Sequence, residues 1–101
     1  MSKNNKKAQA LFKKAAKGKR KLIQAMLEDI DQTTLLADGF DAAILGFTES
    51  FPVQVIYDHD TCLHILQADG MKEEEAFEYF HFNVLGAHVG EQTPIFMHSL
   101  R

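Results

Sequence analysis

Hydrophobic residues recur every three or four positions between residues 4 and 30, which is the spacing of one face of an α-helix. Gly18 interrupts this pattern and lowers helix stability by about 1 kcal/mol relative to alanine. The sequence therefore predicts either one helix of about 26 residues or two helices joined near Gly18. The recurring residues are Ala8, Leu11, Phe12, Ala15, Ala16, Leu22, Ile23, Met26, Leu27 and Ile30.

Two short apolar runs in the middle of the chain are typical of β-strands. The first covers residues 43–48, and the second covers residues 53–57, where side chains alternate between two faces. Pro52 stands at the start of the second run, where its missing N–H does little harm. Residues 94–99 follow a loop and are expected to form a third strand.

Two helices are expected between the second and third strands. Asp58 or Asp60 is placed to cap the first helix, which should end at the turn signal Asp69-Gly70. The second helix follows Met71 and carries three glutamates in its first turn, where the helix dipole favours negative charge. Its expected apolar stripe consists of Ala76, Tyr79, Phe80, Val84 and Ala87.

Together these elements predict one small α+β domain. We expect an antiparallel sheet of about three strands covered by helices, in the order ααββααβ. Residues 1–30 form a basic N-terminal helical arm in this prediction, and residues 40–101 form the compact α+β domain. The chain has 101 residues, which suits one folding unit with one core.

Charge is distributed very unevenly along the chain. Nine of the eleven lysine and arginine residues lie in the first 21 positions, whereas all fourteen acidic residues lie from Glu28 onward. Such asymmetry indicates an interaction segment attached to an acidic body. No apolar stretch is long enough to cross a bilayer, so we expect no membrane partner.

Six basic residues near the N-terminus are candidates for contacts with nucleic-acid phosphates. Lysine outnumbers arginine eight to one in this segment, so we expect backbone binding without reading of the base sequence. Two other interpretations stay open: the charged face is solvated or pairs with acidic residues of its own or a neighbouring chain, or it binds an acidic protein. The candidates are Lys13, Lys14, Lys17, Lys19, Arg20 and Lys21.

Metal-ligating residues do not follow a known spacing. The group that most resembles a metal site is Asp58, His59, Asp60 and His64. Adjacent residues rarely converge on one ion, and the two aspartates are better explained as helix caps. Three further histidines, His81, His88 and His98, show no regular ligand spacing. We therefore expect no metal and no cofactor.

The single cysteine, Cys62, lies on the apolar side of its predicted helix and is expected to be a small buried hydrophobe. One cysteine cannot form an internal disulfide and fits a reducing cytosol. The sequence contains no nucleophile elbow, phosphate loop or dinucleotide fingerprint, so no catalytic residue is expected.

Asn83 is a polar residue within the apolar stripe of the last predicted helix. If it is buried, its amide needs hydrogen-bond partners, because an unpaired one costs about 1–3 kcal/mol. The structural interpretation is that Asn83 holds the Gly90–Thr93 loop or a strand in place. The functional interpretation is a small ligand pocket. Its lining would be Tyr57, Asn83, Glu91 and Thr93, and a small enzyme or ligand sensor would also use Asp58.

Residues 40–97 resemble a family of small uncharacterised proteins from tailed phages and prophages. The resemblance lies in Tyr57-Asp58, Ile65-Leu66, Asp69-Gly70-Met71, Glu74-Glu75-Ala76, Glu78-Tyr79-Phe80, Phe82-Asn83, Gly86-Ala87, Val89-Gly90-Glu91 and Thr93-Pro94-Ile95-Phe96. The family usually has serine or threonine in place of Lys72, which together with Glu75 would form a capping box. The basic N-terminal helix is not part of the pattern. The resemblance implies a phage or prophage source and the cytoplasm of a bacterial host cell.

These observations predict a non-enzymatic accessory protein that binds a host or phage macromolecule. Its binding would modulate host processes or host defence. Nucleic-acid-backbone binding through the basic helix is the first alternative, and a small ligand-binding or enzymatic domain is the second. A host or phage protein is the expected partner. The apolar stripe of the N-terminal helix either folds back on the sheet or packs against a second copy, which would make a homodimer.

Overall fold

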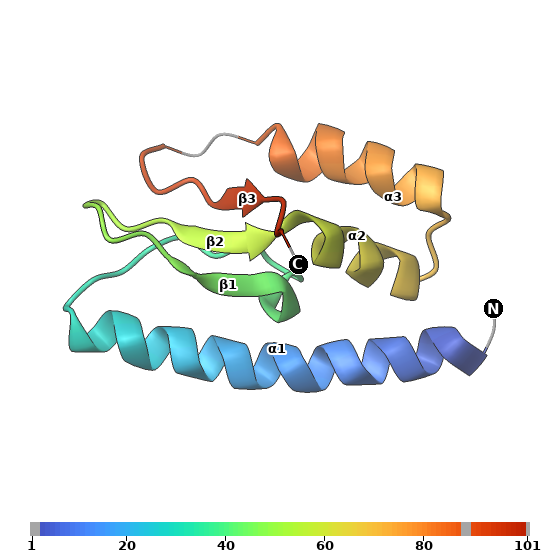
Figure 1. Ribbon diagram of the computed structural model, residues 1–101, viewed down its shortest axis with the longest axis horizontal. Helices are drawn as coiled ribbons and strands as arrows, with labels where there is room; N and C mark the ends of the chain where they lie inside the picture. The colour runs from blue at the N-terminus through green and yellow to red at the C-terminus, as the bar shows by residue number, and fades with distance from the viewer. Residues whose placement is uncertain (1–2, 88–89, 101) are drawn as a thin grey trace.

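The computed structural model describes residues 3–87 and 90–100, with side chains from residue 6 onward (Figure 1). It confirms the predicted α+β class. Of the two alternatives left open at Gly18, the structure shows one continuous helix. The elements are α1 (Lys3–Asp29), a 3-10 turn (Asp41–Ala43), β1 (Ile44–Phe47), β2 (Val55–Asp58), α2 (His59–Ala68), α3 (Glu73–Tyr79), a π-helical segment (Phe80–Leu85) and β3 (Ile95–Met97).

The three strands form one mixed sheet in the order β1-β2-β3. β1 and β2 are antiparallel, as expected, but β3 runs parallel to β2, with Ile56 opposite Ile95 and Asp58 opposite Met97. The expectation of an antiparallel sheet was therefore wrong for β3. The reason is the connection: α2, α3 and the π-helical segment return the chain to the end where β2 began, and such a crossover makes the next strand parallel.

α1 lies along one long side of the molecule, with the sheet and α2 in the middle and α3 on the other long side (Figure 1). Ile23 and Leu27 belong to the buried core, and Phe12 and Ala16 pack against it. Of the two interpretations of the apolar stripe, the structure shows folding back onto the body. Part of the stripe nevertheless faces outward, with Leu11, Leu22 and Met26 exposed by 68%, 62% and 45%.

β2 runs through the centre of the core. Val55 and Tyr57 are fully buried, and Phe80 and Cys62 are buried beside them. Aromatic rings meet around this strand: Tyr57 stacks on Phe96 at 5.3 Å between ring centroids, and Phe80 meets Phe96 edge-on at 5.1 Å. The expectation that Cys62 is a buried hydrophobe is confirmed, and burial raises the pKa of its thiol to about 12.

The connection between α1 and the 3-10 turn is held to the sheet by polar contacts. The Thr34 hydroxyl donates to the Val53 carbonyl at 2.8 Å, and the backbone N–H of Ala37 donates to the Tyr57 hydroxyl oxygen at 2.7 Å. The Asp38-Gly39 turn follows, where Gly39 has a φ of +89° that favours glycine. Residues 31–40 are therefore an ordered part of the domain.

The helix ends follow the sequence signals closely. Asp58 caps α2, accepting from the Thr61 backbone N–H at 3.1 Å, and α2 ends before Asp69-Gly70. At the start of α3, Glu75 accepts from the Lys72 backbone N–H at 3.1 Å, while the Lys72 side chain makes no capping bond. An ammonium group has no acceptor atom, so only one half of a capping box is present.

The prediction that Asn83 lies buried among core residues was wrong. Asn83 is exposed, and its amide donates to the carbonyl of Tyr79, one turn earlier in the same helical stretch, at 3.2 Å. Residues 80–85 are π-helical, and a π-helix holds more residues per turn than an α-helix. The 3.6-residue spacing counted from Phe80 therefore no longer places Asn83 over the core.

Tyr57→Phe tests the polar contact between the connection and the sheet. Removing the hydroxyl leaves the Ala37 N–H without its acceptor, so we expect the free energy of unfolding to fall by about 1–3 kcal/mol. The measurement is chemical denaturation followed by circular dichroism. Tyr79→Phe is the matched control, because Tyr79 is 43% exposed and its replacement should change stability little. Equal stability of the two variants would contradict the role given to the Tyr57 hydroxyl.

Asn83→Ala tests the corrected position of this residue. Because the lost hydrogen bond is exposed and lies within one helical stretch, the free energy of unfolding should change by less than about 1 kcal/mol. Ala76→Gly, at a fully buried helical position, should lower it by about 1 kcal/mol or more. Denaturation curves of both variants measure these changes. If Asn83→Ala lowers the free energy of unfolding more than Ala76→Gly does, Asn83 has the structural role that the sequence suggested.

Candidate functional site

The first candidate is a row of six lysines on the solvent side of α1, which we call the lysine face. At 100° per residue these positions fall within an arc of about 120°, and the row is about 22 Å long. All six side chains are exposed, and in the described part of the chain none of them forms an ion pair with a carboxylate. The lysine face consists of Lys6, Lys7, Lys13, Lys14, Lys17 and Lys21.

Lys19 and Arg20 do not belong to this face, although the sequence grouped them with the other candidates. The Lys19 ammonium donates to the Ala42 carbonyl at 2.9 Å, and the Arg20 guanidinium contacts both carboxylate oxygens of Asp41. The hydrogen bond to Asp41 raises the pKa of Arg20. Both residues lie on the docked side of the helix, so they hold α1 against the 3-10 turn.

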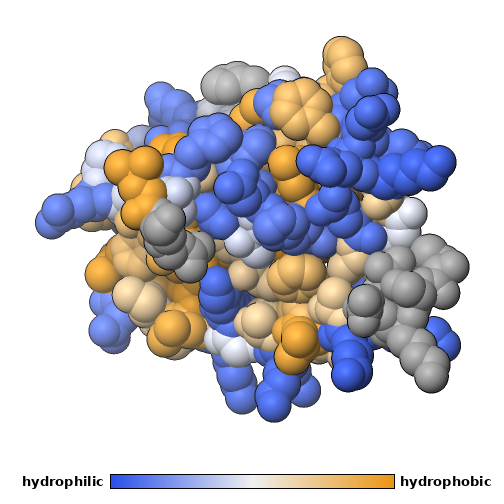
Figure 2. All heavy atoms as spheres, turned by 45° about the vertical axis from the view of Figure 1, so that its right-hand side comes forward, coloured by the Kyte–Doolittle hydropathy of each residue, from blue (hydrophilic) through white to orange (hydrophobic). Residues whose placement is uncertain are grey.

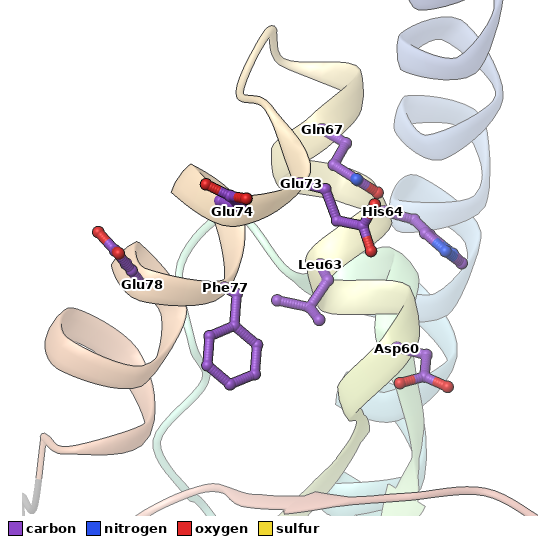
Figure 3. Close-up of a pocket in the computed structure, with 8 residues that line it drawn as sticks. All are labelled: Asp60, Leu63, His64, Gln67, Glu73, Glu74, Phe77 and Glu78. Carbon is purple, nitrogen blue, oxygen red and sulfur yellow. The ribbon is translucent and has the colours of Figure 1, made fainter.

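The second candidate is a groove of about 710 Å³ between α2 and α3 (Figure 3). Leu63 of α2 and Phe77 of α3 are the apolar residues that line it. Figure 2 brings this end of the molecule forward and shows a broad hydrophilic area there. The polar residues lining the groove are Asp60, His64, Gln67, Glu73, Glu74 and Glu78.

The glutamates of this groove come from α3, which lies on the opposite long side of the molecule from α1 (Figure 1). The structure therefore keeps the two charged surfaces apart. Within the described residues, no ion pair joins the lysine face to the negative residues of α3.

The five polar residues predicted for ligand binding or for a structural role lie in separate surroundings in the structure. Tyr57 and Asp58 are buried, and burial raises the pKa of Tyr57 to about 12. Glu91 is exposed, and the Thr93 hydroxyl donates to the Gly90 carbonyl within its own loop at 2.7 Å. Asn83 alone of the five lines the cavity of about 430 Å³ between the 31–40 connection and β3.

A histidine cluster lies where β2 and β3 end, and the sequence pattern did not reveal it. His59 is buried, its Nδ1 lies 3.1 Å from an Asp60 carboxylate oxygen, and its Nε2 lies 3.5 Å from Nε2 of His81. The His98 ring lies 4.2 Å from the His59 ring between centroids. His64 lies instead in the groove between α2 and α3. His88 is outside the described residues.

The lysine face, the groove between α2 and α3 and the histidine cluster are the surfaces with a distinctive chemistry in the described parts of the chain. None of the helices described there has both the length and the apolar composition needed to cross a membrane. Comparisons with protein-family models, with curated proteins and with solved structures give no match for this chain.

Proposed function

We propose that this protein is a non-enzymatic binding module whose lysine face engages the phosphate backbone of nucleic acid. The observation that carries the proposal is the arrangement of α1, which is docked by one side and presents on the other six exposed lysines that form no ion pair with any described carboxylate. The backbone of a nucleic acid carries a long series of negatively charged phosphates. Neutralising these phosphates releases condensed counterions. A row of ammonium groups along one face of a helix is complementary to such a series.

The residue types on this face favour backbone contacts over base recognition. The face contains lysines and no arginine, because the single arginine of α1 is bound to Asp41. Bidentate contacts to guanine, the commonest base-specific contact, are made mainly by arginine. We therefore propose binding that depends weakly on sequence. The resemblance to tailed-phage proteins suggests the cytoplasm of an infected bacterium as the setting.

A second candidate partner is a basic segment of a host or phage protein bound in the groove between α2 and α3. The specific observation is the combination of three glutamates with the apolar pair Leu63 and Phe77 in one groove. Acidic surfaces of this kind can also occupy sites that normally bind nucleic acid. This surface and the lysine face are distinct, so variants separate the two proposals.

Replacing Lys13, Lys14, Lys17 and Lys21 with glutamine should abolish most of the affinity for a generic duplex. For four to six phosphate contacts, affinity of the unaltered protein should fall about 100- to 1,000-fold between 50 and 200 mM salt. The quadruple variant should lower the slope of log K against log salt by about 3–4. Fluorescence anisotropy with labelled duplexes of two unrelated sequences measures both quantities.

The control is the triple variant E73Q/E74Q/E78Q, which alters exposed charge on α3 and leaves α1 intact. It should keep duplex binding, and it should lose any basic protein partner captured by the unaltered chain. Duplex affinity that is independent of salt, or that survives the quadruple lysine replacement, would contradict the nucleic-acid proposal. Equally tight binding to vesicles of anionic lipid would also contradict it, because the surface would then be selective only for negative charge.

A further inference from the structure

We propose that His59, Asp60 and His98 form a binding site for a divalent transition-metal ion of the zinc class. One ligand atom from each of these residues lies within 4.8 Å of the others. Two imidazoles and a carboxylate are a donor set suited to zinc and to neighbouring late first-row metals. The site lies at the end of the sheet and is independent of the lysine face.

The strand register brings these residues together. β2 and β3 are parallel, with Asp58 directly opposite Met97. The residues that follow, His59 and His98, therefore leave the same edge of the sheet side by side. Parallel pairing is essential here, since an antiparallel β3 would carry His98 to the opposite edge.

His59 is buried and closely packed. Its side chain is only 8% exposed, and its ring meets the Phe80 ring edge-on at 5.2 Å between centroids. Adjacent residues rarely converge on one ion, but here the fold has already brought Nδ1 of His59 to 3.1 Å from the Asp60 carboxylate oxygen. Two donor atoms on a tetrahedral zinc with bonds of 2.0–2.2 Å lie about 3.3–3.6 Å apart, so this pair already has nearly the required separation.

The remaining ligands have room to close on the ion. Asp60 has a side chain that is 67% exposed, and His98 is also exposed. Small rotations of these two side chains shorten separations of up to 4.8 Å to those found around one metal. Three protein ligands leave a further coordination position open to water or to a donor from a ligand.

His81 is placed to orient His59 from the other side. Its Nε2 lies 3.5 Å from Nε2 of His59, and its ring stacks on Phe77 at 4.1 Å between centroids. A metal-bound histidine usually donates its second ring N–H to a fixed acceptor, which sets the tautomer and the ring angle. With the metal on Nδ1 of His59, the Nε2–H of His59 donates to His81, which acts as a positioning residue.

The electrostatics of the helix end are also compatible with a cation. The N-terminus of α2 carries a partial positive charge, which by itself disfavours a metal ion. Two carboxylates offset it: Asp58 caps the helix, and Asp60 lies in its first turn. These two carboxylates would compensate part of the positive charge of a bound ion.

The test uses the full chain without an affinity tag, treated with chelator and then titrated with ZnCl2 or CoCl2. We expect one Zn²⁺ per chain by calorimetry, a rise in Tm with Zn²⁺ and none with Mg²⁺, and visible d–d absorption from bound Co²⁺. His98→Ala and Asp60→Asn, which alter exposed side chains, should each weaken binding by about 100-fold or more. His81→Ala should weaken it by about 10-fold while leaving the Co²⁺ spectrum unchanged, because the ligands are the same.

His64→Ala is the matched control, since this histidine is also on α2 but lines the groove and is not one of the proposed ligands. It should bind Zn²⁺ as the unaltered chain does. Absence of stoichiometric Zn²⁺ binding to the unaltered chain would overturn the proposal. So would a His98→Ala, Asp60→Asn double variant that is folded by circular dichroism and binds Zn²⁺ with undiminished affinity. In either case His59 and Asp60 are a simple hydrogen-bonded pair.

Discussion

The parallel pairing of β3 with β2 is the constraint on which the rest of the structure depends. Two parallel neighbours cannot be joined by a tight turn, so the chain must cross over, and α2, α3 and the π-helical segment supply that crossover. The same pairing completes the burial of Tyr57, whose ring stacks on Phe96 of β3. It also decides which side chains share an edge of the sheet, and His59 and His98 are neighbours for that reason.

α1 stabilises the domain and presents charge at the same time. Its inner side contributes Ile23 and Leu27 to the core and is fastened by the Arg20–Asp41 ion pair. Its outer side carries lysines that find no carboxylate within the described residues. The uneven charge along the sequence thus corresponds to a real separation in space, since α1 and α3 occupy opposite sides of the molecule (Figure 1). A helix can hold both roles because its periodicity assigns neighbouring residues to different faces.

Local signals in the sequence predicted much of the fold, whereas contacts between distant segments could not be predicted from them. Apolar periodicity located the helices, and Asp69-Gly70 marked the end of α2. The run of basic residues placed Arg20 among the candidate phosphate contacts, whereas the structure pairs it with Asp41. A count of charges along the chain does not say which side of the helix each residue occupies. The π-helical segment displaced Asn83 from the face that a regular helix gives it. The meeting of His59 and His98 depends on strand register, and no spacing in the sequence records it.

The continuous, docked form of α1 has a thermodynamic consequence for any complex that it makes. A basic tail that is disordered when free must lose backbone and side-chain entropy on binding, which reduces its net affinity. α1 is already helical over 27 residues and anchored by its apolar side. The ordering has been completed during folding, so in the proposed complex with nucleic acid ion release would be the main driving force of association. Such a preformed surface gives little gain in helix content and a small heat-capacity change when a polyanion docks on it.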